Sequence, residues 1–413
     1  MVTKHDIFKI VYNHRTPIKP TDILKQLRKQ ESEYDNILRI LLELKNKGIL
    51  TKNDYGFQVK TSVNTKLLHD IIDHCLNNDI NYNELLNPNL VEFISKALQK
   101  KEFTSKDIKL HSATLRKYID ILSKSGLLLI ISKKPLRFKV FYNVLLNNIL
   151  VYFGYKHQVI TNDSTNYLLE IEKELTKFKK LRRGNELKYQ KIVEEFEISF
   201  VHHSLALEGN PITINETRKI LKDKIIPANL KTKDVDEVKN YQKAILDMLG
   251  KSGGGVPLTL QTILDYHFTA MEHEPEIAGK IRTMEVFISG NLDFKITKAE
   301  NVERELDELL KKYSIFIKKK KISLKEILDF VVYFHNEFQY IHPFEDGNSR
   351  TTRLITFWIL NSKEIPMLDI PFGLLDEYLS YTKGSKKRDD KKLFDNLQKT
   401  ILFNIKKINE KLD

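Results

Sequence analysis

The sequence predicts a mainly α-helical protein whose first third holds two small α+β modules. Helical spacing of apolar residues runs through most of the chain from Asn166 onward, and two helix–helix–glycine–strand–strand patterns precede residue 150. A short polar stretch near residue 345 interrupts two strongly apolar helices. With 413 residues and 41 % apolar side chains, the chain is long enough for two or three domains with buried cores.

Composition excludes several classes of protein. The longest aliphatic run, Leu127–Ile131, is far shorter than the roughly twenty residues that a membrane-spanning helix needs. The N-terminal residues lack the apolar stretch and cleavage pattern of a secretory signal. The single cysteine, Cys75, permits no internal disulfide or cysteine-based metal cage, and we expect it to be buried. We therefore expect a soluble cytoplasmic protein with no membrane partner.

The positive charge is concentrated in the first third. Residues 1–150 contain 25 Lys and Arg against 15 Asp and Glu, a net charge of +10, whereas residues 151–413 contain 43 against 40, a net charge of +3. A local basic excess favours a polyanion-binding module. A genome biased toward lysine, isoleucine and asparagine codons would produce the same excess, so composition alone leaves both interpretations open.

The two N-terminal patterns repeat with an offset of 78 residues. In the first copy, helices are predicted over Asp22–Gln30 and Tyr34–Lys47, Gly48 is placed to end the second helix, and two strands flank residues 53–56. In the second copy the same order is predicted, and its segments are Lys106–Lys109, Ser112–Ser125, Gly126 and two strands around Lys133–Pro135. We expect modules at residues 1–62 and 63–150, which we call the first and second modules.

This order of elements is typical of a winged helix-turn-helix, in which the second helix enters the major groove of DNA. We therefore predict a DNA partner for residues 1–150. The basic residues expected to contact it lie in the second module: Arg116, Lys117, Lys133 and Lys134. Winged helices also serve as dimerisation or protein-docking modules, and the sequence does not separate these roles.

The remainder is predicted to be helical in two parts, residues 165–255 and 256–405. A helix is expected to end at Gly250, and residues 252–255 read as a flexible surface loop. Lys318–Lys321 is expected to be a solvated helix end.

The segment Ser323–Leu360 carries the chemistry. Ser323 and Glu326 form the capping box of a helix with a buried apolar stripe, and a second apolar helix resumes at Leu354. The trough between them gathers six polar or turn-forming residues within nine positions: His342, Glu345, Asp346, Gly347, Asn348 and Arg350. A hydrophobic core has no use for so many polar groups, and so a functional site is predicted here.

The residue types in this trough fit phosphate chemistry. The backbone of Gly347, Asn348 and Ser349 at a helix start can bind anions. Asp346 is an oxygen ligand suited to Mg²⁺, and His342 can take a proton from a hydroxyl. Arg350 and Arg353 lie three apart on one helix face and can brace phosphate oxygens. Each residue alone has a structural alternative, a helix cap or a surface ion pair.

The run from His342 to Arg353, HPFEDGNSRTTR, resembles the signature of the Fic (Fic/Doc) family. Residues 204–210, SLALEGN, are similar to the inhibitory helix motif that precedes the family's core in its second class, with Ser204 and Glu208 in the motif positions. Residues 279–290, including Val286 and Ser289, resemble the β-hairpin flap that positions the target side chain. The resemblance covers roughly residues 170–405 and implies an all-helical Fic core with a small β-hairpin.

The resemblance implies a protein adenylyltransferase, which moves AMP from ATP to a serine, threonine or tyrosine hydroxyl of a protein. His342 would be the general base, Asp346 would hold Mg²⁺, and Gly347, Asn348, Ser349 and Arg350 would contact phosphates. Val286 and Ser289 would line the nucleotide-binding side of the flap. The sequence does not identify the protein substrate, and it leaves open whether the chain modifies itself and whether it forms a homodimer.

The inhibitory motif implies autoinhibition. Arg353 would bind the terminal phosphate of ATP or, in the resting state, pair with Glu208. A glutamate on that arginine occupies space and cancels charge, and so ATP would bind in an unproductive pose.

Two positions depart from the family pattern. Ser349 stands where the family usually has glycine; serine is unfavourable if the position needs a positive φ and tolerated if it is helical. The family's adenine-pocket asparagine has no clear counterpart near Tyr378 and Tyr381, each of which could stack on a base or belong to the core. Two alternative functions follow: removal of AMP with Glu208 orienting water, or a DNA-binding regulator whose Fic part senses nucleotide or dimerises.

Overall fold

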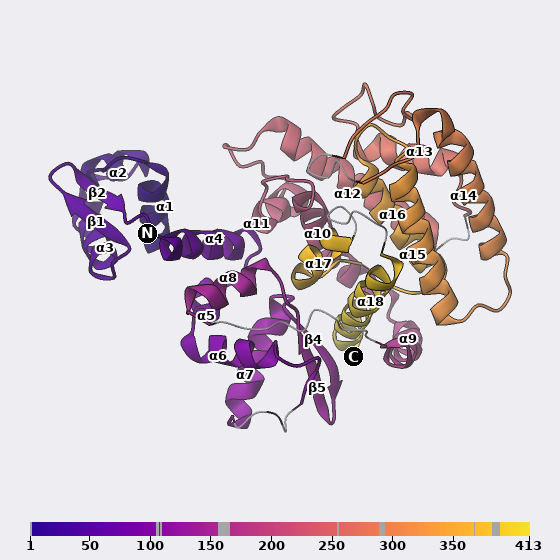
Figure 1. Cartoon of the computed structure of the whole chain (residues 1–413), viewed down its shortest axis with the longest axis horizontal. Coiled ribbons are helices and arrows are strands. Elements are labelled where there is room, and N and C mark those ends of the chain that lie inside the picture. The colour runs from indigo at the N-terminus through magenta and orange to yellow at the C-terminus, as the bar shows by residue number, and fades with distance from the viewer. Residues whose placement is uncertain are drawn as a thin grey trace. The chain divides into compact units, whose positions relative to one another are not determined.

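The computed structural model describes residues 2–104, 107, 110–155, 166–253, 256–288, 294–366, 368–381 and 389–413. The chain divides into two compact units (Figure 1). The first unit contains Met1–Cys75 and Leu145–Lys156, and the second contains Leu76–Val144 and His157–Asp413. Helices dominate the fold, in agreement with the predicted class. Among the described residues, each helix is too short or too polar to cross a membrane.

The first unit contains three short helices and a two-stranded antiparallel sheet, followed by the start of a longer helix. Their bounds are α1 Lys4–Asn13, α2 Pro20–Gln26, α3 Tyr34–Asn46, β1 Leu50–Asn53, β2 Gly56–Val59 and α4 Val63–Asn77. Ile18 bridges to Phe57 and adds a third, minimal edge to the sheet. The predicted helix–helix–glycine–hairpin order is thus present, and its apolar residues form a hydrophobic cluster of their own.

The second copy of the pattern lies in the second unit. Its elements are α5 Tyr82–Leu85, α6 Pro88–Ala97, β3 Phe103–Thr104, α7 Ser112–Lys124, β4 Leu128–Lys133 and β5 Leu136–Val140. The next helix, α8 Val144–Tyr152, belongs to the first unit from Leu145 onward. The three strands form an antiparallel sheet in the order β3-β5-β4. The helix predicted over Lys106–Lys109 lies almost wholly outside the described residues. Leu129, Ile131 and Phe141 pack into the same hydrophobic cluster as the helices that follow in the chain.

The rest of the second unit is a helical core. It contains α9 Leu168–Arg182, α10 Glu186–Ala206, α11 Ile214–Arg218, α12 Thr232–Ser252, α13 Leu260–Ala270, α14 Val302–Ile317, α15 Leu324–Ile341, α16 Asn348–Ser362, α17 Leu375–Tyr381 and α18 Asp390–Leu412. Helix α12 continues two residues beyond the predicted end at Gly250. Figure 1 shows α15 and α16 side by side, and α16 also contacts α12 and α13. Because α16 is surrounded in this way, every residue from Asn348 to Leu360 is buried.

Candidate active site

Helix α15 delivers His342 to the start of the polar turn. The predicted capping box is present: Glu326 N–H donates to Ser323 Oγ, and Ser323 N–H donates to the Glu326 carboxylate. The helix ends at His342, whose φ of +50° turns the chain sharply. The buried Arg282 fixes this end, because its Nε donates to the His342 carbonyl at 2.7 Å and its backbone N–H donates to the Pro343 carbonyl at 2.9 Å. Sequence analysis had placed Arg282 in the flap and missed this role.

The turn is closed by its own side chains. Asn348 Oδ1 accepts from the Phe344 N–H at 2.9 Å, and Asn348 Nδ2 donates to the Phe344 carbonyl at 2.8 Å. The Gly347 N–H donates to Asp346 Oδ1 at 2.6 Å, so this carboxylate is held at the start of α16. Burial would raise the pKa of Asp346, but the Arg350 guanidinium and the Gly347 N–H outweigh it and lower the pKa.

The turn requires glycine at position 347. Its φ is +77°, and a Cβ there would lie 2.9 Å from the Met271 side chain and 3.0 Å from His267 Nε2. His267 accepts from the Gly279 N–H at Nδ1, so Nε2 carries the proton and donates to the Asp346 carbonyl at 2.9 Å. Burial lowers the pKa of His267 to about 4, which keeps the ring neutral. The sequence offered no local signal for His267, since its partners lie far along the chain.

Ser349 is compatible with its position. It is the second residue of α16, and helical backbone accommodates serine without strain. The departure from glycine therefore does not disturb the turn.

The ion pair predicted between Arg353 and Glu208 is formed. Arg353 Nη2 donates to Glu208 Oε1 at 2.8 Å and to the Ser204 carbonyl at 2.9 Å, while Arg353 Nε donates to Ser204 Oγ at 2.6 Å. The Ser204 hydroxyl in turn donates to Tyr241 Oη at 2.8 Å. Burial alone would lower the pKa of Arg353, but the Glu208 charge outweighs it and raises the pKa. With side-chain exposures of 1 % and 14 %, Arg353 and Glu208 form a nearly dry ion pair.

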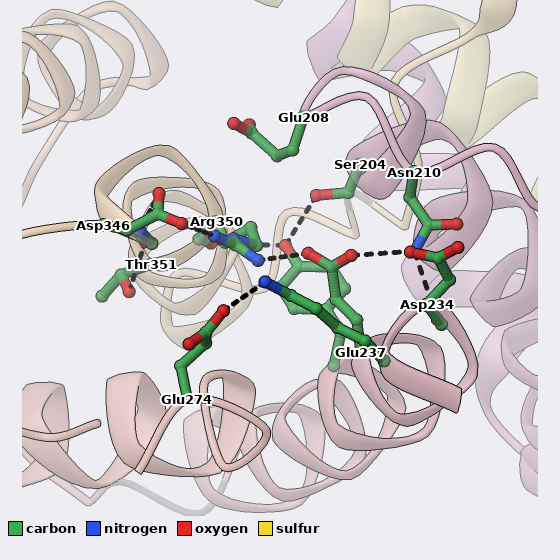
Figure 2. A network of polar contacts seen from close by, with 12 residues as sticks. Ser204, Glu208, Asn210, Asp234, Glu237, Glu274, Asp346, Arg350 and Thr351 are labelled. Atoms are coloured by element: carbon green, nitrogen blue, oxygen red, sulfur yellow. Dashed lines mark hydrogen bonds and ion pairs between the residues drawn. The ribbon is translucent and has the colours of Figure 1, made fainter. Parts of the chain in front are cut away.

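Arg350 has a partner that sequence analysis missed. Its Nη2 donates to Asp346 Oδ2 at 2.8 Å, and its Nη1 donates to Glu237 Oε1 on α12. Figure 2 shows Glu237 between Arg350 and Asn210, and Asn210 Nδ2 donates to Glu237 Oε2 at 2.8 Å. The predicted site residues on the turn and on α16 are thus brought together, and they are joined to residues 204–210, which carry the predicted inhibitory motif and are called the inhibitory segment below.

The flap is described in part. Residues 279–288 run without a hydrogen-bonded strand among them, and Val286 is half-buried there. Met284 and Phe287 are exposed, which fits a surface that meets another molecule. Ser289 lies outside the described residues.

The two tyrosines considered as partners for a nucleotide base, Tyr378 and Tyr381, differ in burial. Tyr378 is buried and its hydroxyl is 2.8 Å from His335 Nε2, so it belongs to the core. Tyr381 is half-buried, and the Lys392 ammonium lies over its ring.

The four predicted DNA contacts are all exposed, but their surroundings are partly occupied. Lys133 is paired with Glu410 of α18 at 2.9 Å. Lys117 lines a cavity of about 390 Å³ that is also lined by His203 and Phe403 of the helical core. Lys134 is exposed and lines another cavity together with Lys406 and Glu410 of α18. Arg116 is exposed. DNA binding by the second module stays a prediction.

A glycine turn between two buried helices, with a histidine before it and two arginines after it, defines the Fic class of domain. Residues 257–360 match the model of the Fic/DOC family and are a Fic/DOC family domain. The N-terminal modules lie outside this match.

Relatives and structures agree with this assignment. The chain is 27 % identical over 210 residues to a protein from Nematostella vectensis named protein adenylyltransferase Fic, covering 49 % of this chain and 46 % of that protein. A protein of the same name from Drosophila erecta is 24 % identical over 197 residues, covering 48 % and 38 %. The chain thus spans less than half the length of these relatives. A crystal structure of a Fic domain containing signaling protein from Bacteroides thetaiotaomicron matches with a TM-score of 0.52 at 20 % identity, covering 59 % of this chain and 96 % of that one, which shows a shared fold.

Proposed function

We propose that this protein is an autoinhibited protein adenylyltransferase that transfers AMP from ATP to a serine, threonine or tyrosine hydroxyl of a protein. The observation that carries the proposal is the Glu208–Arg353 pair, which joins the inhibitory segment to the last arginine of the motif. The names of the relatives support the reaction class.

The chemistry follows from the turn. The target hydroxyl loses its proton to the His342 imidazole while its oxygen bonds to the α-phosphorus of ATP. The bond from that phosphorus to the bridging oxygen of the β-phosphate breaks, and pyrophosphate leaves with the electron pair. The amides at the start of α16 and the positive end of its dipole stabilise the added negative charge.

Asp346 fits a Mg²⁺ ion that arrives with the phosphates. Its side chain is 66 % exposed, and among the described residues no group of three or more metal-ligating side chains surrounds it. Mg²⁺ commonly binds through one or two carboxylates together with substrate phosphates. The ion would neutralise phosphate charge there, with Asp346 as its protein ligand.

Glu208 explains the resting state in this proposal. Its carboxylate occupies the donor that a terminal phosphate would take from Arg353, and the low exposure of the pair strengthens the contact. Activation requires the inhibitory segment to move, so that Arg353 becomes available to ATP.

Intact mass spectrometry tests the proposal directly. Wild type, Glu208→Gly and Glu208→Gly/His342→Ala would each be incubated with Mg²⁺, ATP and a lysate-derived protein mixture, with α-labelled ATP in parallel. We expect labelling in Glu208→Gly, little in wild type and none in the double variant. Label in none of the three, with folding confirmed by circular dichroism, would contradict the proposal.

A further inference from the structure

Arg350 needs a permanent counter-charge, and two carboxylates supply it. Its side chain is only 5 % exposed, and an uncompensated charge at that depth is strongly destabilising. Asp346 and Glu237 share the guanidinium, yet they differ in setting: Asp346 is 66 % exposed, whereas Glu237 is 13 % exposed. In the proposed reaction Asp346 turns to the metal and phosphates, and Glu237 is then the carboxylate that stays with Arg350.

Both oxygens of Glu237 are engaged, which fixes its orientation. Oε1 accepts from Arg350 Nη1, and Oε2 accepts from Asn210 Nδ2 at 2.8 Å. With Nη1 held on this side, Arg350 directs Nη2 toward Asp346, the side on which the phosphates are expected. Arg350 Nε is buried without a hydrogen-bond partner among the described residues, so a further donor remains for an incoming anion.

Asn210 connects this arrangement to autoinhibition. It lies two residues after Glu208, and its side chain is itself fixed, because Oδ1 accepts from the Ile212 N–H at 3.0 Å and Nδ2 also donates to the Asp234 carbonyl at 3.2 Å (Figure 2). A displacement of the inhibitory segment that carries Asn210 away therefore removes one of the two contacts that orient Glu237.

We propose that Glu237 is a positioning residue that holds Arg350 for the phosphates of ATP, and that Asn210 ties this position to the inhibitory segment. The inhibitory segment then acts on both arginines of α16, on Arg353 directly through Glu208 and on Arg350 through Asn210 and Glu237. This inference rests on the proposed nucleotide transfer and adds a second point of control to it.

The first test uses the released background, Glu208→Gly, and compares it with Glu208→Gly/Glu237→Gln. Glutamine can still accept from Arg350, but it removes the charge and offers Asn210 a donor instead of an acceptor. We expect the Kd for Mg-ATP by calorimetry, and the KM for ATP in labelling, to rise about tenfold, which is typical when a charged hydrogen bond is weakened. We expect kcat to change less than about threefold and the unfolding temperature to stay within a few degrees.

Two variants control for a merely structural effect. Glu237→Asp restores the charge and should recover part of the ATP affinity. Glu274→Gln removes a nearby carboxylate that is paired with Lys233 rather than with an arginine of α16. It should leave the affinity for Mg-ATP unchanged. Equal Kd values in Glu208→Gly and Glu208→Gly/Glu237→Gln would overturn the role of Glu237. Since calorimetry needs no turnover, this result is distinct from a failure of Glu208→Gly to label, which would refute the proposed reaction instead.

The link to autoinhibition is tested with Glu208 in place. Asn210→Ala removes the hydrogen bond that holds the inhibitory segment to Glu237 and leaves the Arg350–Glu237 pair intact. The segment should then leave Arg353 more readily, and labelling should rise severalfold over wild type, but less than in Glu208→Gly. In the Glu208→Gly background the same substitution should add nothing further. Unchanged labelling in Asn210→Ala would overturn the coupling.

Discussion

The two N-terminal modules share a local structure but differ in what surrounds it, and equivalent glycines show the difference. Gly48 and Gly126 both end the second helix of their module with φ near +70°. A Cβ on Gly48 would meet open space, whereas one on Gly126 would lie 3.4 Å from the Phe372 backbone, and the Gly126 carbonyl accepts from the Gly373 N–H at 3.1 Å. The two copies share a local fold, and in the second copy that fold is built into the second unit. Because this unit contains the Fic/DOC domain at residues 257–360, it is called the Fic unit below.

The second copy also contacts α10 and α11, the helices that precede and follow Glu208 in the sequence. Asn78 Oδ1 lies 3.3 Å from His202 Nε2 on α10, and Asp79 Oδ1 accepts from Asn215 Nδ2 at 3.1 Å on α11. These contacts flank Glu208 on both sides in the sequence. A segment outside residues 257–360 thus contacts the helices on either side of Glu208, whereas the first module contains a separate hydrophobic cluster.

The largest expected difference is the response to acid: the stability of the Fic unit should depend on pH more strongly than the stability of the first module. Burial lowers the pKa of His202 to about 3 and of His267 and His335 to about 4, and all three lie in the Fic unit. Below the ordinary pKa of 6.5 the unfolded chain binds protons that the folded unit does not, so stability falls as pH drops toward 4. Between pH 6.5 and 5 each histidine costs about 1.7 kcal/mol, or roughly 5 kcal/mol for the three.

Fluorescence of Trp358 measures this effect, because the sole tryptophan is buried in α16. We expect its urea midpoint to fall steeply between pH 7 and 5. The partly exposed His5 of the first module provides the control, and His5→Gln should leave the Trp358 transition and its pH dependence unchanged. A midpoint independent of pH would show that these histidines are not buried as neutral rings.

The second-largest difference is expected from truncating a buried phenylalanine, because the two substitutions should destabilise different parts of the molecule. Phe141 is buried in the cluster that includes the Fic helices, and Phe57 is buried in the cluster of the first module. Phe141→Ala should lower the stability of the Fic unit by about 3–5 kcal/mol through the cavity it leaves. Phe57→Ala should cost a similar amount within the first module and leave the Trp358 transition in place. Hydrogen exchange in peptides from α3 and α16 reads the two effects separately, and loss of protection in α16 on Phe57→Ala would contradict the comparison.

The features that could be predicted from the sequence are those set by residues close together in the chain. Apolar spacing with a glycine end located α3 and α7, and the capping box located the start of α15. The turn from His342 to Arg353 was placed between two buried helices because its polarity interrupts their pattern.

Long-range partners had no such signal. His267, Arg282 and Glu237 contact the turn or α16 from 60 or more positions away, and each resembles an ordinary helix or loop residue in its own neighbourhood. The incorporation of the second module into the Fic unit was equally hidden, because the strand residues that pack outward are as apolar as those that pack inward.

An added methyl group where Gly373 packs against Gly126 and Phe141 should have a smaller effect on stability. We call this contact the junction. A Cβ on Gly373 would lie 2.6 Å from the Gly126 carbonyl oxygen and 2.9 Å from the Phe141 ring, so the junction must shift. Gly373→Ala should destabilise the Fic unit by about 2–3 kcal/mol, within the range of overpacked cores. Gly48→Ala has free space and adds only left-handed backbone strain, about 1 kcal/mol, in the first module. Urea titration followed by Trp358 should therefore respond to Gly373→Ala alone, and an equal response to Gly48→Ala would refute the distinction.

The smallest expected effect tests whether the second copy helps to hold Glu208. Asp79→Ala removes two contacts: the hydrogen bond from Asn215, and the exposed ion pair in which Arg218 Nη1 lies 3.8 Å from Asp79 Oδ2. Exposed pairs contribute little, so nucleotide labelling by an otherwise wild-type chain should rise only about two- to fivefold. The matched control is Glu92→Ala, since Glu92 is an exposed carboxylate of the same module that forms its ion pair with Lys96 within α6. In the Glu208→Gly background Asp79→Ala should have no effect, because the contact it weakens serves only to keep Glu208 on Arg353. A rise of the same size in that background would place Asp79 in nucleotide transfer itself and not in its restraint.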